Sequence, residues 1–330
     1  VDETWWSNCV PGGYTRINGL VACRGTGGRG PRRESSYVVS LVQVLLRVPS
    51  VAAWLGVHVQ HCRAAATAEA RLRRCAACAM WQARVVLAAL VRARGSAPDC
   101  TMVKNRALAG CQFADIAEHD VAEFMKGWLE EVRRIEVSAG RTTLWPGVIC
   151  GESGECTHLE RLFGHVREER SVCVQCGRLS TRYTREWSLV MPVWSADWPE
   201  RVRVTDLYSE SCKSKADATL AKCNGACGAV TPHRVQARAV TTPNVLLVQV
   251  QQPGADGALK KFSLDVEDQL HLPGMDALEL AAVVYHDGSN VSSGKYWCVC
   301  RNVDGCFWMF KDAAAPIRLS SHVDWSAKPK

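Results

Sequence analysis

Two stretches of the chain repeat apolar residues at the 3.6-residue spacing of a helix. The first begins after Ser35 and Ser36, which can cap a helix, and stops at Pro49, whose ring cannot continue one. The second opens on Asp115 and Glu118, a pair that resembles a capping box. The apolar positions of the two stretches are Tyr37, Leu41, Val44, Leu45 and Val48, followed by Val121, Phe124, Met125, Trp128, Leu129, Val132 and Ile135. Both patterns predict amphipathic helices that pack one face against a core.

The segment between these helices, residues 62–94, is rich in alanine and arginine and predicts a further helix or pair of helices. It carries Cys75 and Cys78 in the sequence C-A-A-C. Because no second cysteine pair lies nearby, we interpret both residues as buried thiols rather than metal ligands.

The second half of the chain has the pattern of strands. Three extended stretches are predicted as strands: residues 185–193, 241–252 and 278–286. Residues 297–301 and 307–311 are predicted to pair as a hairpin across a turn at residues 304–305.

Two close cysteine pairs flank the first of these strands. Cys173 and Cys176 form C-V-Q-C, Cys223 and Cys227 form C-N-G-A-C, and 46 residues separate the pairs. Each short loop places two sulfurs on one side of a metal ion, so folding can bring four thiolates into the tetrahedral arrangement that Zn²⁺ prefers. A glycine follows the second cysteine of each pair, where a tight turn needs positive φ. We predict a structural zinc site at these four residues; four unpaired structural thiols are the alternative.

The composition of the chain limits which class of protein it can be. With 330 residues and 47 % hydrophobic content, the chain can bury a large core, as one large domain or two ordinary ones. It has 17 cysteines but no apolar N-terminal signal segment, which favours a reducing compartment, cytoplasmic or nuclear. No run of 18 apolar residues is present, so no membrane span is expected.

The formal net charge of +7 comes largely from arginines between Arg24 and Arg94. Solubility alone accounts for a balance of this size, so nucleic-acid binding is disfavoured. The Gly/Arg-rich residues 25–33 are interpreted as a solvated insertion, with RNA binding as the minor alternative. Residues 1–18 are interpreted as an irregular lead-in.

Five motifs follow one another along the chain. Residues 35–49 read S-S-Y-V-V-S-L-V-Q-V-L-L-R-V-P, and residues 118–129 read E-H-D-V-A-E-F-M-K-G-W-L. The two cysteine pairs with their intervening strand come third, and T-T-P-N-V-L-L-V-Q-V-Q-Q at residues 241–252 comes fourth. Residues 282–312 carry A-V-V-Y-H-D-G, S-G-K-Y and W-M-F-K-D. In this order the motifs resemble the sequence boxes of ubiquitin-specific proteases, and the resemblance spans residues 19–319.

The resemblance implies an α+β, papain-like domain over residues 19–320. Its parts would be a helical thumb (19–164), zinc-clamped antiparallel β fingers (165–235) and a β palm (236–320), followed by a tail at 321–330. It also implies ubiquitin or a ubiquitin-like protein as the partner, with protein scaffolds as further partners. Asp120, His286 and Tyr296 are the residues that the resemblance places along the channel for the ubiquitin tail.

The catalytic positions of this family are substituted in the chain. By the resemblance, the nucleophilic cysteine falls on Ser36, the general-base histidine on Lys295, its orienting residue on Lys311, and the oxyanion-hole asparagine on Pro31. Asp312 matches a second acid of the last motif but has no base left to orient. Cysteine hydrolysis needs a thiolate, a neighbouring imidazole and oxyanion donors. We therefore expect thiol isopeptidase activity to be lost, which would make the chain a pseudoprotease.

Two other functions stay open. A working deubiquitinase would use Ser36 itself or a relocated nucleophile such as Cys23. A basic scaffold would bind RNA or protein through its arginine-rich segments.

Overall fold

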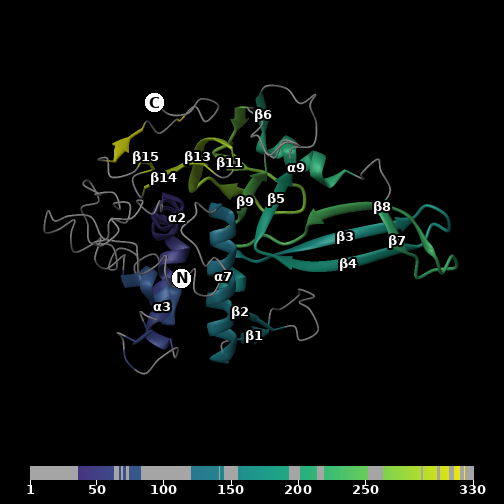
Figure 1. The fold of residues 1–330 in the computed structure, drawn as a ribbon, viewed down its shortest axis with the longest axis horizontal. Helices are drawn as coiled ribbons and strands as arrows, with labels where there is room; N and C mark the ends of the chain where they lie inside the picture. Colours follow the sequence, from purple (N-terminus) through teal and green to yellow (C-terminus); the bar gives the residue numbers. More distant parts are fainter. Residues whose placement is uncertain are drawn as a thin grey trace, which may run out of the picture. The chain divides into compact units, whose positions relative to one another are not determined.

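The computed structural model describes residues 36–62, 67, 70–71, 74–82, 120–140, 142–144, 155–192, 201–213, 219–251, 263–290, 293–302, 305–311, 316–319 and 323 (Figure 1). Several sequence predictions lie outside these residues: the lead-in, the Gly/Arg-rich segment, Cys23, Pro31, Asp115, Glu118, Asp312 and nearly all of the tail.

The chain divides into two compact units. Unit 1 comprises Val1–Arg141, Ala255–Leu259 and Ala281–Val323. Unit 2 comprises Thr142–Gly254, Lys260–Leu280 and Asp324–Lys330. The boundaries proposed for thumb, fingers and palm stay predictions.

The described part of unit 1 includes the helices α2 (Ser36–Arg47), α3 (Pro49–His61) and α7 (Val121–Ser138). The predicted stop before Pro49 is confirmed, because the chain bends by 91° between α2 and α3. The proline takes the first turn of α3, where its missing N–H costs no hydrogen bond. Asp120 caps α7: its carboxylate accepts hydrogen bonds from the amides of Ala122 (2.7 Å) and Glu123 (3.2 Å).

Aromatic pairs join the three helices into one core. The ring of Tyr37 on α2 meets Phe124 on α7 edge-on at 5.4 Å, and Trp54 on α3 meets Trp128 on α7 edge-on at 5.9 Å. These edge-to-face contacts are the favoured geometry for aromatic rings, and all four side chains are buried. The apolar spacing therefore marks the buried face of α7 correctly. The single buried face predicted for α2 is wrong, because ten of its twelve residues are buried while Val44 is only half-buried. Among the described residues no single helix is long and apolar enough to cross a membrane; α2 and α3 meet that test only together, as a bent pair.

An antiparallel sheet completes unit 1. Its strands are β13 (Ala282–Asn290), β14 (Ser293–Arg301), β15 (Phe307–Phe310) and β16 (Ile317–Arg318), in that order, and α2 packs on β14. The predicted hairpin of β14 and β15 is confirmed. The predicted strand at 278–286 is divided: β12 (Leu278–Glu279) pairs with β11 (Gln269–Leu270) in unit 2, while β13 pairs with β14. Residues 281–286 are half-buried rather than buried.

Unit 2 contains a four-stranded antiparallel sheet in the order β4-β3-β8-β7. Its strands are β3 (His165–Cys173), β4 (Leu179–Glu186), β7 (Thr219–Lys222) and β8 (Val230–Ala239). The Glu168 carboxylate on β3 is buried, and it accepts hydrogen bonds from Tyr183 on β4 (3.1 Å) and Arg238 on β8 (2.8 Å). The antiparallel β fingers predicted from the family resemblance are present.

The remaining strands of unit 2 form small pairs. β1 (Thr142–Leu144) pairs with β2 (Glu155–Thr157), which leads into helix α8 (His158–Phe163). β5 (Ser188–Pro192) runs parallel to β9 (Leu247–Gln251), and β6 (Arg201–Arg203) runs parallel to β10 (Ser263–Asp265). The strand predicted at 185–193 is thus split between β4 and β5, and the one predicted at 241–252 is shortened to β9.

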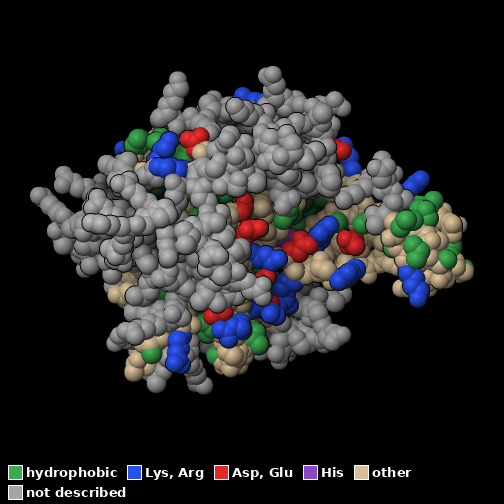
Figure 2. Space-filling view, viewed as in Figure 1, with side chains coloured by type: hydrophobic (Ala, Val, Ile, Leu, Met, Phe, Trp, Pro, Cys, Tyr) green, Lys and Arg blue, Asp and Glu red, His purple; other side chains and the backbone are tan. Residues whose placement is uncertain are grey.

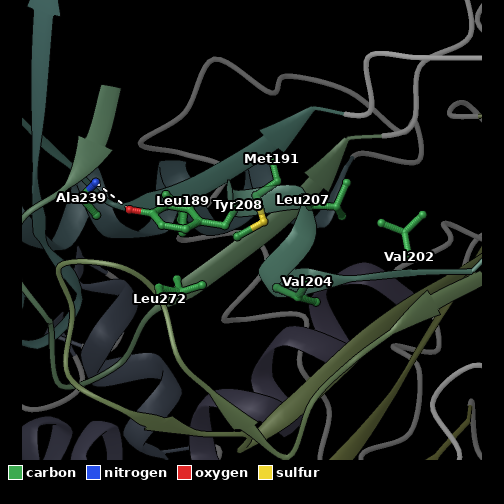
Figure 3. Packing of buried hydrophobic residues seen from close by; sticks show 8 residues of the cluster. All are labelled: Leu189, Met191, Val202, Val204, Leu207, Tyr208, Ala239 and Leu272. Atoms are coloured by element: carbon green, nitrogen blue, oxygen red, sulfur yellow. Dashed lines mark hydrogen bonds between the residues drawn. The ribbon is translucent and has the colours of Figure 1, made fainter. Parts of the chain in front are cut away.

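The core of unit 2 gathers around helix α9 (Val204–Cys212), as Figure 3 shows. Eight buried residues form it: Leu189, Met191, Val202, Val204, Leu207, Tyr208, Ala239 and Leu272. The Tyr208 hydroxyl accepts a hydrogen bond from the amide of Ala239 at 2.9 Å, so the end of β8 is fastened to α9. Burial raises the pKa of Tyr208 to about 12, so this hydroxyl stays protonated at neutral pH.

His165, at the start of β3, is expected to make unit 2 sensitive to acid. Its side chain is fully buried, neither ring nitrogen has a hydrogen-bond partner among the described residues, and burial lowers its pKa from 6.5. As the pH falls below about 6.5, His165 binds a proton in the unfolded chain but not in the folded chain, where its pKa is lower. The free energy of unfolding therefore decreases. Urea unfolding at pH 7.5 and 5.5 measures this decrease.

The variant His165→Leu is expected to lose this part of the pH dependence. His158→Gln is the matched control, because His158 lies nearby on α8 but is exposed to solvent. Equal acid sensitivity in His165→Leu and in the unmodified chain would contradict the assignment.

Candidate functional site

The four cysteines predicted from the sequence lie together at one end of the β4-β3-β8-β7 sheet. The Sγ atoms of Cys173 and Cys227 are 3.9 Å apart, and those of Cys176 and Cys223 are 3.6 Å apart. All four sulfurs lie within 4.8 Å of one another. We call these four residues the cysteine quartet; the group could hold a metal ion.

Two tight turns set the spacing of the cysteine quartet. Cys173 ends β3 and Cys223 follows β7, so the first sulfur of each pair is fixed by a strand. The glycines after the second cysteines, Gly177 and Gly228, have φ of 70° and 62°. A side chain would be strained at such angles, which agrees with the turn chemistry expected from the sequence.

Hydrogen bonds already favour a thiolate at one position of this quartet. The Thr231 hydroxyl lies 3.3 Å from the Cys173 sulfur, and this contact together with the amide of Cys176 lowers the pKa of Cys173 to about 6. The neighbouring sulfurs, Cys176 first, raise the pKa of Cys227 to about 12, because like charges repel. Four thiolates therefore require a cation between them, and an all-sulfur tetrahedral set suits zinc or iron.

A second group of ligand-type side chains lies in unit 1. His58, Cys62, Cys75 and Cys78 are all buried, and one donor atom of each lies within 4.8 Å of the others. We call them the histidine–cysteine quartet. The prediction that Cys75 and Cys78 are buried is confirmed, and their role as thiols rather than ligands stays a prediction. The sequence reasoning missed His58 and Cys62, which lie beside them. The signal was the spacing H-x-x-x-C on a helix end, followed by C-x-x-C.

The residues that the family resemblance aligns with catalytic positions lie around strand β14. Ser36, the first residue of α2, is buried, and its hydroxyl oxygen accepts a hydrogen bond from the amide of Tyr296 at 3.1 Å. Lys295 precedes Tyr296 on β14 and lies opposite Asp287 in the register with β13. The structure thus brings Ser36 beside the strand that carries Lys295, although 259 positions separate the two numbers in the sequence.

Asp287 is the residue near this site that the sequence did not single out. Its carboxylate lies 3.8 Å from the ammonium group of Lys311, which follows β15. The same ammonium group lies 5.9 Å from the centre of the Trp297 ring. Asp287 is therefore an acidic residue between both lysine positions, opposite one in register and in ionic contact with the other.

The three residues predicted to line the ubiquitin-tail channel have defined structural contacts. The Asp120 side chain caps the N-terminus of α7. His286 and Tyr296 face each other across β13 and β14 with ring centroids 4.7 Å apart. All three belong to unit 1, but their assignment to a channel stays a prediction.

A known protein family matches most of this chain. The ubiquitin carboxyl-terminal hydrolase family matches residues 31–321, which is most of the chain. The chain belongs to the ubiquitin carboxyl-terminal hydrolase family. No curated protein matches it by sequence.

Solved structures with the same fold come from the SAGA DUB module. A chain of the Ubp8, Sgf11, Sus1 and Sgf73 module bound to monoubiquitin matches with a TM-score of 0.69 at 17 % identity, covering 96 % of this chain and 70 % of that chain. The module bound to ubiquitin aldehyde gives the same values. A yeast module with an Sgf73 mutant matches with a TM-score of 0.65 at 17 % identity, covering 93 % and 66 %. These matches establish the fold of a ubiquitin-specific protease, with helices, antiparallel sheets and cysteine groups that could hold metal.

Proposed function

We propose that this ubiquitin carboxyl-terminal hydrolase domain binds ubiquitin or a ubiquitin-like protein without hydrolysing it. The observation that carries the proposal is the composition of the site around β14. The three positions that the family uses for catalysis carry Ser36, Lys295 and Lys311, and Asp287 pairs with one lysine and faces the other. The arrangement is that of a pseudoprotease.

The surroundings of Ser36 support the loss of chemistry. A serine nucleophile needs a base that removes its proton, and here its oxygen accepts a hydrogen bond from a backbone amide. A lysine becomes a base only when burial strips it of water and removes its proton. Lys295, which takes the position of the base, is exposed to solvent and lacks that burial. Lys311, which takes the position of the orienting residue, contacts the Asp287 carboxylate instead of a base.

We further propose that the cysteine quartet holds a structural zinc ion. Four sulfurs within 4.8 Å, two of them on positive-φ turns, match a closed tetrahedral site with no open position for a substrate. In this role zinc would supply folding free energy to the end of the sheet and take no part in chemistry.

A protein partner fits the surface at that end of the sheet. Figure 2 shows hydrophobic side chains gathered there, and the most exposed are Leu220, Val230, Leu179 and Val174, at 70 %, 65 %, 53 % and 50 %. Exposed apolar residues in a group are typical of protein interaction surfaces. We therefore propose ubiquitin or a ubiquitin-like protein, and scaffold proteins, as partners.

We also propose a cytoplasmic or nuclear location, because no disulfide joins the cysteines in the described part of the chain.

Calorimetric titration with ubiquitin tests the binding half of the proposal. We expect a saturable heat of binding, weakened when the titrant is ubiquitin that lacks its C-terminal Gly-Gly, because the family fold takes up the tail. The double variant Leu220→Asp, Val230→Asp is expected to weaken binding as well, and Val57→Asp, an exposed residue of α3 in unit 1, is the control. Absence of heat at high-micromolar protein, for ubiquitin and for ubiquitin-like proteins, would remove the binding function.

A further inference from the structure

We propose that His58, Cys62, Cys75 and Cys78 form a second metal site, which takes Zn²⁺ through one imidazole and three thiolates. The family resemblance pointed to one zinc site, in the fingers, and this second site rests on the geometry of unit 1 alone. It is independent of whether the domain binds ubiquitin.

The spacing of the donor atoms suits a tetrahedral ion. Zinc lies about 2.3 Å from sulfur and about 2.0 Å from nitrogen, so ligand atoms around it are roughly 3.5 to 3.8 Å apart. In the histidine–cysteine quartet all four donor atoms lie within 4.8 Å, and His58 Nε2 lies 3.3 Å from the Cys75 sulfur. Small adjustments therefore bring the four donors to bonding distance of one ion.

Two short segments of the chain each carry two of the four donor residues. His58 lies in the last turn of α3 and Cys62 caps its end, four residues later. Cys75 lies at the start of a helical segment, where its carbonyl accepts a hydrogen bond from the amide of Ala79 at 3.1 Å, and Cys78 follows one turn on. Arg71 ties the two halves together, because its guanidinium group donates to the carbonyl of Cys62 at 3.2 Å. Residues on one helix face at these spacings are neighbours.

The orientation of His58 is fixed by a carboxylate behind it. Glu136 on α7 is 1 % exposed, and its Oε1 lies 3.3 Å from His58 Nδ1. The same oxygen accepts a hydrogen bond from the indole N–H of Trp54 at 3.1 Å. With the ring proton on Nδ1, facing Glu136, the lone pair of Nε2 points toward Cys75. A carboxylate, a histidine and a metal in line is the usual outer-shell arrangement of zinc sites, and it makes Glu136 a positioning residue.

Burial distinguishes this group from a chance meeting of cysteines. Each of the four side chains is at most 5 % exposed, and they lie at the junction of α3, the helical segment at 76–82 and α7. The competing interpretation is a buried ion pair of protonated His58 with Glu136, surrounded by neutral thiols. The two interpretations differ in metal content, which can be measured directly.

Zinc content of the purified protein, measured by inductively coupled plasma mass spectrometry, is the first test. We expect two zinc ions in each unmodified chain. The double variant Cys75→Ser, Cys78→Ser should contain one, and the double variant Cys173→Ser, Cys223→Ser should also contain one. Cys212→Ser, a cysteine outside both groups, is the control and should retain two. Retention of two ions in the Cys75/Cys78 variant, or a single ion that only the Cys173/Cys223 variant removes, would overturn the second site. A single ion that only the Cys75/Cys78 variant removes would instead overturn the zinc proposal for the cysteine quartet.

Spectroscopy keeps the test decisive if a variant fails to fold. Cobalt bound to the Cys173→Ser, Cys223→Ser protein should show X-ray absorption from three sulfur ligands and one nitrogen ligand. The unmodified chain should show the average of this site and an all-sulfur site, so a nitrogen ligand is expected there too. Glu136→Gln is expected to weaken zinc affinity about 10- to 100-fold in competition with a chelator, because the histidine loses its orienting partner. An all-sulfur spectrum in the unmodified chain would contradict the proposed ligand set. Unchanged zinc affinity in Glu136→Gln would contradict the role of Glu136.

Discussion

Ubiquitin carrying a C-terminal fluorogenic amide is expected to remain uncleaved by this domain, with turnover at least about 10⁴-fold below that of an active member of the family in the same assay. Removal of one member of a catalytic triad costs about this factor, and three positions are substituted here. The expectation rests on the contacts of Ser36 and Lys311. The first accepts a backbone hydrogen bond, and the second, at the position of the orienting residue, pairs with Asp287 instead of a base.

Matched variants separate an inactive site from a serine-based one. Ser36→Ala should leave the background rate unchanged, as should Ser40→Ala, a buried serine one turn along α2. Turnover that Ser36→Ala abolishes and Ser40→Ala preserves would establish a serine nucleophile. Turnover that only Cys23→Ala abolishes would establish a relocated one. Either result would replace the pseudoprotease proposal with a working deubiquitinase.

Loss of the cysteine quartet is expected to unfold the end of the β4-β3-β8-β7 sheet. In the double variant Cys173→Ser, Cys223→Ser, the turns between paired strands lose the ion that holds them. A structural zinc ion contributes roughly 10 to 16 kcal/mol in small zinc domains, which exceeds or equals the whole stability of many domains. Apolar burial adds little at these turns, because the side chains around them, Val174, Leu220 and Val230, are exposed.

Hydrogen–deuterium exchange measures this effect locally. Amides of residues 171–180 and 220–234 should lose protection in the variant, while those of α7 in unit 1 should keep it. Cys212→Ser, on α9 of the same unit, should exchange like the unmodified chain. Unchanged protection around the quartet after the double substitution would show that the sheet end is stable without metal.

Local patterns account for most of what was predictable. The amphipathic helix α7 and the β14–β15 hairpin follow from apolar spacing and turn chemistry within short segments. The cysteine quartet follows from two short spacings, each with a glycine in the one conformation its turn allows. In each case the residues that determine the feature are near neighbours in the chain, so a single sequence contains the information.

Other features depend on which distant segments meet. The parallel pairing of β5 with β9 joins residues about sixty positions apart, and nothing in either strand specifies its neighbour. The stretch at 278–286 has the apolar pattern of one strand, but two different partners divide it. Pairing of this kind is set by competition among long-range contacts, which periodicity does not report.

The amino-acid sequence by itself determined that the residues aligned with the triad by the family resemblance, Ser36, Lys295 and Lys311, include no cysteine, histidine or acid, because residue identity alone answers that question. Only the tertiary structure decided that Asp287 stands between the lysine positions and that His58 and Cys62 join Cys75 and Cys78. Both arrangements come from helices and strands that pack across long stretches of chain. Their energies depend on distance and burial in space, which are fixed when the core forms.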